Sequence, residues 1–519
     1  MLLDHLLSLT IFVPLAGTGL LLFIDGGRKA LLRGIALGTS LITLGLSYLL
    51  FLGFRPNAEF QFVEEAPWIP GYGISYLVGL DGISLLLIIL TTFLVPLAIL
   101  SSYKAITEKV KGFMAALLVM ETGILGVFAA LDLFLFYIFW EAMLIPMVFL
   151  IGIWGGERRL YASIKFLLFT MLGSLLMLVA IIALYNQGYA ELGRFTTSYL
   201  DLRQISLSPA TQTWMFLAFG LSFAIKIPMF PLHTWLPDAH VEAPTAGSVL
   251  LAGVLLKLGG FGFLRYCLPL FPLAVERFAP LMVALAAIAI IYGALLAFAQ
   301  TDMKKLVAYS SVSHMGYVVL GIFALTLQSV TGGLLQMINH GLTTGALFLL
   351  VGMLYERTHT REIAHYGGVA QLLPKFSAIF LITVLASIGL PGLNGFVSEF
   401  LIILGSYPTQ PVGAIVAALG VILSAVYLLW LVQRVFYGMP SKQLKAIAEK
   451  EGKMPSDLSR REWAVLLPIV AMMIWIGVYP RPLVSRIEPS VQALVSEYRA
   501  ATEVAAEDFA ETLGNNGEN

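Results

Sequence analysis

Four ionisable residues fall inside stretches of the sequence that are otherwise apolar. They are two acids, Glu141 and Glu399, and two lysines, Lys226 and Lys257. A charge at membrane depth costs several kcal/mol, so such residues are rare and often mark a path for ions or protons. Two acids and two lysines in one membrane bundle predict a proton relay. The alternative is that each acid and lysine form a buried salt bridge that only holds helices together.

The relay interpretation assigns each charged group a step. Glu141 lies about nine residues, or roughly 14 Å, into its apolar stretch, too deep for a carboxylate to reach either surface. Lys226 is its predicted partner, because opposite charges favour each other's ionised form. A buried lysine such as Lys257 can cycle between charged and neutral forms near neutral pH, which makes it the predicted central carrier. Glu121, in AALLVMETGILGVF, is a predicted second partner in the charge network.

Two histidines, His314 and His340, also lie in apolar stretches, accompanied by serine, threonine and asparagine. Histidine titrates near physiological pH, so the pair favours a connecting relay over simple hydrogen bonds between helices. A third group, His233 and His240 with neighbouring acids, matches no strong zinc signature. Metal binding and proton entry both remain open for these two histidines.

Composition places these residues in a membrane. The 519-residue chain is 59% hydrophobic and 12% charged, with zero formal net charge and a mean hydropathy of +0.88. These values predict a polytopic membrane protein and give no indication of a nucleic-acid partner. The single cysteine, Cys267, excludes a cysteine-ligated iron–sulfur cluster within the chain, and no dinucleotide-binding fingerprint is present. Electron transfer must then occur outside this chain.

Apolar runs long enough to cross a bilayer predict an all-α protein with about fourteen transmembrane helices. The run at 5–24 lacks a basic leader region and is predicted to be a retained first span. Prolines interrupt the runs 212–237 and 376–407, at Pro228 with Pro231 and at Pro391, and predict two discontinuous helices of the kind that transporters use near ion sites. The predicted spans are about 5–24, 30–54, 83–101, 112–130, 132–153, 161–185, 212–237, 246–264, 279–298, 304–324, 331–354, 376–407, 412–436 and 461–480.

The connections between spans differ in charge. Lysine and arginine concentrate after odd-numbered spans, which predicts that those loops are cytoplasmic and that both termini are outside. Segment 55–80 is then an external hairpin-like loop. Residues 485–513 predict an amphipathic surface helix, solvated rather than bound to a partner, that ends in a disordered GNNGEN tail.

Five motifs together resemble the antiporter-like subunit M (chain 4) family of respiratory complex I, the proton-pumping NADH:quinone oxidoreductase. They are FYIFWEAMLIPM, KIPMFPLHTWLPDAHVEAPTAGS, AYSSVSHMGY, NHGLTTGALFLLVGMLYERTHTR and LPGLNGFVSEF. The resemblance covers about residues 75–485. It implies that Glu141 and Lys226 form the input pair, that Lys257 is the central lysine, and that His314 and His340 connect it onward. Glu399 matches a position where sibling subunits carry lysine. The polar run 438–463 and the C-terminal tail are not part of the core pattern.

The resemblance implies two inverted five-helix repeats. The expected divisions are N-terminal helices with an external loop, two antiporter-like repeats, and a cytoplasmic loop with the last helix and tail; they span 1–110, 111–264, 279–437 and 438–519. The expected function is proton translocation coupled to quinone reduction in other subunits. This chain would hold no cofactor, while FMN and iron–sulfur clusters would reside in partner subunits. The expected partners are neighbouring antiporter-like subunits and the lipid bilayer, in a bacterial inner membrane.

Three other functions compete with this interpretation. The corresponding membrane subunit of a multisubunit sodium/proton antiporter shares the bundle but has no redox arm, and Glu399 argues against it. A membrane subunit of an energy-converting hydrogenase would differ in its electron donor. A structural spacer would tolerate neutralisation of the buried charges.

Overall fold

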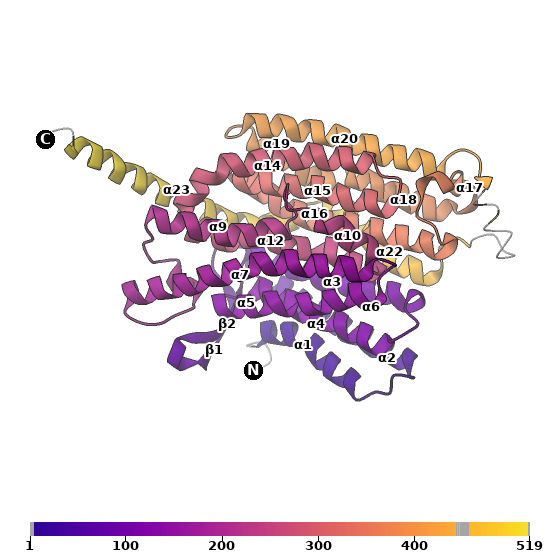
Figure 1. Cartoon of the computed structure of the whole chain (residues 1–519), viewed down its shortest axis with the longest axis horizontal. Coiled ribbons are helices and arrows are strands. Elements are labelled where there is room, and N and C mark those ends of the chain that lie inside the picture. The colour runs from indigo at the N-terminus through magenta and orange to yellow at the C-terminus, as the bar shows by residue number, and fades with distance from the viewer. Residues whose placement is uncertain (1–4, 443, 445, 447–455, 517–519) are drawn as a thin grey trace.

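The computed structural model describes residues 5–442, 444, 446 and 456–516, and side chains as far as residue 504. The helices lie roughly parallel, with the N-terminal helices along one edge and α20 along the other (Figure 1). Within the described ranges, eleven helical segments are long and apolar enough to cross a membrane, so the chain is a multi-pass membrane protein. They are α2 (Lys29–Gly53), α3 (Gly82–Ala105), α4 (Val110–Ala129), α5 with α6 (Leu133–Trp154), α7 (Arg159–Leu192), α11 to α13 (Thr245–Leu270), α14 (Pro272–Phe298), α15 (Met303–Phe323), α16 (Leu327–Thr358), α20 (Pro411–Phe436) and α22 (Arg460–Val478).

Shorter helices account for the remaining predicted spans. The first run forms α1 (Leu6–Leu22). The two proline-interrupted runs are broken where the sequence predicts. α9 (Pro209–Lys226) ends at Lys226 and α10 (Trp235–Glu242) follows, while α18 (Pro374–Ser387) is separated from α19 (Asn394–Ser406) by the Pro391 turn. In that second turn Gly389 and Gly392 have φ of 75° and 90°, which only glycine adopts without strain.

Two irregularities were not predicted. The run expected as one span at 132–153 is divided into α5 (Leu133–Ala142) and α6 (Leu144–Trp154), directly after Glu141. Pro146 lacks the N–H that would continue the helix across this point. The run at 246–264 contains two π-helical segments, Leu251–Leu255 and Phe263–Cys267, on either side of α12 (Leu256–Gly262). Such segments free backbone carbonyls and often occur at functional sites.

The basic connections contact one another at one end of the bundle. The Lys29 ammonium donates to the Thr107 carbonyl at 2.8 Å, and Arg357 binds Glu462 through two hydrogen bonds of 2.7 and 2.8 Å. α17 (Val369–Leu372) and the start of α22 lie at this end, on the right of Figure 1. Lys445, Lys450 and Lys453, which contribute to the predicted charge bias, lie outside the described residues.

The opposite end carries the only sheet among the described residues. Segment 55–80 forms an antiparallel hairpin of β1 (Gln61–Ile69) and β2 (Ile74–Leu80), joined by the 3-10 turn Pro70–Tyr72. The segment that leads into the short α8 (Tyr199–Leu202) contacts this hairpin, because the Thr197 N–H donates to the Gly73 carbonyl.

The C-terminal helix differs from its prediction. α23 runs from Arg481 to Asn516 and extends beyond the end of the bundle (Figure 1). Its first half is not solvated, because apolar side chains at helical spacing are buried against the bundle; they include Leu483, Ile487, Val491 and Leu494. The tail residues 514–516 continue the helix, and residues 517–519 lie outside the described part of the chain.

Candidate functional site

Four predicted relay residues come together in the centre of the bundle. Lys257 is on α12, His314 on α15, His340 on α16 and Glu399 on α19, and each of these side chains is at most 3% exposed. α15 and α16 lie in the middle of the molecule, enclosed by the other helices (Figure 1). This set of four residues is called the central row below.

The first contact of the central row joins a lysine to a histidine. Lys257 Nζ lies 2.7 Å from His340 Nδ1. The same ammonium donates to the carbonyl of Ala252, which belongs to the π-helical segment before α12. The π segment thus supplies a backbone acceptor that holds the lysine head beside His340.

The second part of the central row joins the two histidines to the glutamate. The ring centroids of His340 and His314 are 5.9 Å apart, and His314 Nδ1 lies 3.2 Å from Glu399 Oε1. The other ring nitrogen, His314 Nε2, is 3.4 Å from the Tyr427 hydroxyl. The row therefore consists of two hydrogen-bonded pairs, Lys257 with His340 and His314 with Glu399, whose histidine rings face each other across a gap.

A polar network surrounds Glu399, and sequence reasoning anticipated only Asn339 among its members. Gln336 Nε2 lies 3.3 Å from Glu399 Oε1, and Gln336 Oε1 accepts a hydrogen bond of 2.6 Å from the Ser398 hydroxyl. Asn339 donates to Ser398 and to the Asn394 carbonyl at 2.9 and 2.7 Å. A signal was present in the sequence, since polar residues recur on α16 at helical spacing at positions 336, 339, 340 and 343.

Glu399 also faces a cavity. Its second oxygen, Oε2, has no hydrogen-bond partner among the described residues. A cavity of about 280 Å³ lies against the carboxylate, bounded by the broken turn with Gly389 and Pro391 and by the apolar side chains Phe396 and Phe400. The break between α18 and α19 thus gives the end of the central row access to space outside the packed core.

The serines near His314 donate hydrogen bonds to backbone carbonyls. Ser310 and Ser311 both donate to the Val307 carbonyl, and Ser313 donates to that of Ile290. Their hydroxyls satisfy backbone acceptors, and Ser310 also interacts with the Tyr427 side chain that contacts His314. The Thr344 hydroxyl, in contrast, is buried and has no partner in the described structure.

The predicted salt bridge between Glu141 and Lys226 is not formed. Lys226 Nζ is buried and has no hydrogen-bond partner among the described residues; it lies over the rings of Trp140 and Phe166, at 5.3 and 5.6 Å. Glu141 Oε1 also has no partner there, and the residue is half-buried. Glu141 lies in the last turn of α5, and its carboxylate acts on the Lys226 ammonium through space without contacting it.

Glu121 and the loop histidines stand apart from the central row. Both carboxylate oxygens of Glu121 are buried on α4 without a hydrogen-bond partner in the described chain. The ring of His240 stacks on Phe348 with centroids 4.5 Å apart. Neither ring nitrogen of His240 has a partner within the described ranges. Among these ranges no group of three histidine, cysteine or acidic residues is placed to hold a metal ion.

Glycines allow the lysine-bearing helices to approach closely. A Cβ at Gly259 would lie 2.5 Å from the Phe223 carbonyl on α9, three residues before Lys226. A Cβ at Gly260 would lie 2.5 Å from Met337 on α16. α12 is therefore packed against both the helix that ends at Lys226 and the helix that carries His340.

Cationic side chains pair with backbone carbonyls at one end of the bundle and with a carboxylate at the other end. Lys304 Nζ donates to the Ala243 carbonyl at 2.6 Å and Arg361 donates to that of Val241 at 2.9 Å, so two cations cap the last turn of α10. At the other end Arg265 binds Asp81 at 2.5 Å. Burial alone would raise the pKa of Asp81, but the Arg265 charge and hydrogen bonds hold that pKa below its usual value.

The chain is similar in sequence to known membrane proteins over almost its whole length. Residues 39–126 match the family model described as NADH-ubiquinone oxidoreductase chain 4, amino terminus, and residues 130–425 match NADH:quinone oxidoreductase/Mrp antiporter, TM. The chain is 49% identical over 512 residues to NADH-quinone oxidoreductase subunit M of Rhodobacter capsulatus, covering 96% of this chain and 98% of that one. It is 45% identical to NADH-ubiquinone oxidoreductase chain 4 of Arabidopsis thaliana, covering 94% and 97%.

Two solved structures have the same fold as this chain. A chain of respiratory complex I from Thermus thermophilus with bound NADH superposes with a TM-score of 0.85 at 37% identity, covering 95% of this chain and 99% of that chain. A chain of the Mrp complex from Dietzia superposes with a TM-score of 0.82 at 21% identity over 95% and 98%, which shows a shared fold. The protein therefore belongs to the family of NADH-quinone oxidoreductase subunit M, also called NADH-ubiquinone oxidoreductase chain 4.

Proposed function

We propose that this chain translocates protons across the membrane as subunit M of a NADH:quinone oxidoreductase, driven by redox chemistry in other subunits. The observation that carries the proposal is the central row, in which Lys257, His340, His314 and Glu399 are neighbouring titratable groups in the buried core. A packed bundle has no structural need for four such groups in series, and each is costly to bury.

The geometry supports a stepwise transfer. Lys257 holds a proton between the Ala252 carbonyl and His340 Nδ1. Release to His340 makes that ring the carrier, and rotation or hydration across the 5.9 Å between ring centroids passes the proton to His314. His314 then delivers it to Glu399, whose second oxygen faces the cavity at the α18–α19 break. Histidine suits the middle positions because either ring nitrogen can accept while the other donates.

Lys226 and Glu141 act upstream of this row in the proposal. Lys226 ends α9, and Gly259 and Phe223 bring that helix end against α12, which carries Lys257. A charge on Glu141 stabilises a proton on Lys226, and a change in that charge favours release towards Lys257. Glu121 is proposed as a further charge in this network on the strength of its complete burial.

The assembly around the chain is proposed from its relatives. Neighbouring antiporter-like subunits pack beside it, and FMN and iron–sulfur clusters lie in partner subunits, while this chain holds none. The bundle comprises fourteen spans with two inverted repeats, 111–264 and 279–437; the placement of one broken helix in each range supports this division. The basic ends face the cytoplasm of a bacterial inner membrane, as similarity to the Rhodobacter capsulatus protein supports.

The experiment uses the assembled complex in sealed vesicles, with NADH consumption and proton uptake followed together. Replacing His340→Gln keeps a hydrogen-bonding side chain but removes the titratable ring. Proton uptake and quinone-linked NADH oxidation should both fall strongly. His365→Gln is the matched control, because His365 is exposed in a loop. Normal proton uptake in the His340 variant would remove the row from the path.

A further inference from the structure

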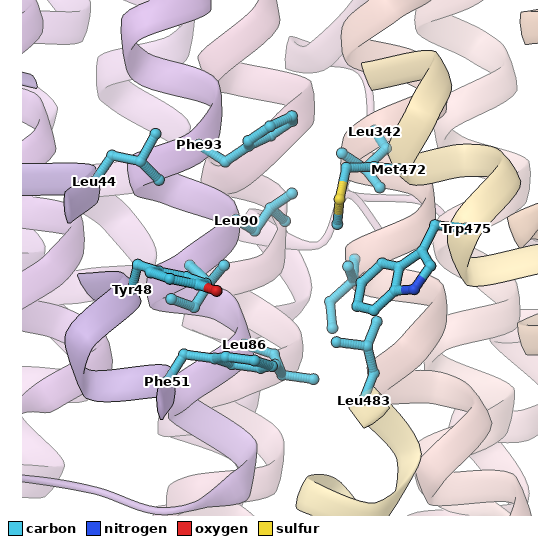
Figure 2. Close-up of a pocket in the computed structure, with 12 residues that line it drawn as sticks. Leu44, Tyr48, Phe51, Leu86, Leu90, Phe93, Leu342, Met472, Trp475 and Leu483 are labelled. Atoms are coloured by element: carbon cyan, nitrogen blue, oxygen red, sulfur yellow. The ribbon is translucent and has the colours of Figure 1, made fainter. Parts of the chain in front are cut away.

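An apolar cavity lies behind the central row, on the far side of α16. Its volume is about 210 Å³, and its lining is almost entirely apolar. Leu44, Tyr48 and Phe51 on α2 face Met472 and Trp475 on α22 across this space (Figure 2). It is called the α2–α22 cavity below.

The walls of the α2–α22 cavity reach the outer surface of the bundle. Tyr48 is 55% exposed and Trp475 is 37% exposed, and both belong to helices that are long and apolar enough to span the membrane. In a bilayer these side chains meet hydrocarbon rather than water. Tyrosine and tryptophan are also the residues that gather near lipid headgroups. The chemistry of the walls therefore suits an acyl chain.

A cation stands at one end of the α2–α22 cavity. The guanidinium carbon of Arg486, on α23, lies 4.1 Å from the centroid of the Phe51 ring, which lines the cavity. One of its nitrogens donates to the Pro482 carbonyl. Its Nε is buried without a hydrogen-bond partner in the described structure. An arginine side chain that keeps unpaired N–H donors is well suited to bind a phosphate group.

The position of Arg486 is fixed by its own backbone. A Cβ at Gly82, the first residue of α3, would overlap the Arg486 carbonyl oxygen. The Gly82 N–H donates to Ser490 at 2.9 Å, one turn further along α23. This contact sets the guanidinium beside the last turn of α2, at the end of the bundle away from the basic loops, where a lipid headgroup would lie.

We propose that the α2–α22 cavity binds one anionic phospholipid, with an acyl chain between α2 and α22 and its phosphate at Arg486. The lipid would also support the central row. Ile338 and Leu342 form part of the cavity wall on α16. His340, two residues from each, points to the opposite side of that helix because two residues rotate the helix by about 200°. The bound acyl chain therefore packs against the back of the helix that positions His340.

Photolabelling tests the site directly. The intact complex is reconstituted in vesicles that contain phosphatidylglycerol with a diazirine in its acyl chain, and labelled peptides are mapped. Label should appear on α2 and α22. Arg486→Gln should reduce it about fivefold, the change expected when about 1 kcal/mol of headgroup attraction is lost. Arg277→Gln should not, because Arg277 is an exposed arginine over Phe278 elsewhere in the chain.

A second pair of variants separates the lipid from a change in folding. Leu44→Trp fills the α2–α22 cavity from its wall and should abolish the label. Leu41→Trp makes the same change on α2 at a residue that is 49% exposed and does not line the cavity, and should leave the label intact. Equal labelling in both tryptophan variants would overturn the proposal. So would equal labelling by a photoreactive diacylglycerol without phosphate, or crosslinks that show a neighbouring subunit filling the space. None of these readouts depends on proton transfer.

Discussion

Replacing Lys257 with arginine should stop proton transfer at the centre of the row. The ammonium lies 2.7 Å from His340 Nδ1, and two positive charges at that separation repel by about 6 kcal/mol at an effective dielectric constant of about 20. Lys257 and His340 therefore share one excess proton rather than carrying one each. Arginine does not release its proton under physiological conditions. In Lys257→Arg, His340 would remain neutral and no proton could move along the row.

The assay compares proton uptake with NADH consumption in vesicles that hold the assembled complex. We expect uptake in Lys257→Arg to fall to the level measured with an uncoupler, with the complex still assembled. Lys304→Arg is the matched control. Lys304 is also buried, but it acts by donating to the carbonyls of Ala243 and Val241, and an arginine can do the same. Lys304→Arg should keep most of the activity.

A wild-type ratio of proton uptake to NADH in Lys257→Arg would mean that Lys257 does not need to lose its proton and is not a carrier. Loss of the assembled complex would be a packing effect at the tight α12 interface. In that case Lys257→Gln, which is shorter and uncharged, should still assemble and should still fail to take up protons.

Three further changes test the surrounding charges. Glu141→Gln should lower proton uptake while leaving the amount of assembled complex unchanged on native gels, because Glu141 makes no salt bridge to Lys226 that could hold helices together; loss of the complex would contradict this. Asp81→Asn should destabilise the fold by about 3 kcal/mol, since it leaves Arg265 buried without its carboxylate; thermal unfolding measures this. The pKa of Asp81 is lowered in the folded state, so ionised Asp81 stabilises the fold above about pH 4, and this stabilisation is lost as the pH falls below that value. The difference in unfolding temperature between wild type and Asp81→Asn should therefore disappear in acid. A difference that is unchanged at low pH would argue against an ionised Asp81. Glu462→Gln should lower the free energy of unfolding by about 3 kcal/mol, because Arg357 donates two hydrogen bonds to that buried carboxylate. Unchanged thermal stability would show that this ion pair does not stabilise the fold.

The sequence predicted the parts of the fold that depend on hydrocarbon length and on proline. Apolar runs became helices, and the breaks at Pro228 and Pro391 appeared where expected, because a missing backbone donor acts locally. The π segments around Lys257 gave no comparable signal. A π segment depends on how a helix packs against its neighbours, and no residue type encodes it.

The candidate site was predictable as a set of residues but not as a set of contacts. Buried charge alone identified Lys257, His314, His340 and Glu399, and the structure brings these four together. The same reasoning paired Glu141 with Lys226, and the structure places their charges within electrostatic reach but without a direct salt bridge. Which side chains meet depends on the rotation of each helix about its axis. Helices that are apolar on all sides carry little information about that rotation.

The central claim is that protons leave the row through Glu399, and proton uptake per NADH in two Glu399 variants tests it most directly. Glu399→Ala removes the titratable group that faces His314 and the cavity. Glu399→Lys keeps a group able to carry a proton, but its positive charge makes protonation of His314 more costly. We predict partial uptake in the lysine variant and a much lower value in the alanine variant. Normal proton uptake per NADH in Glu399→Ala would mean that protons bypass Glu399, and the account would be wrong.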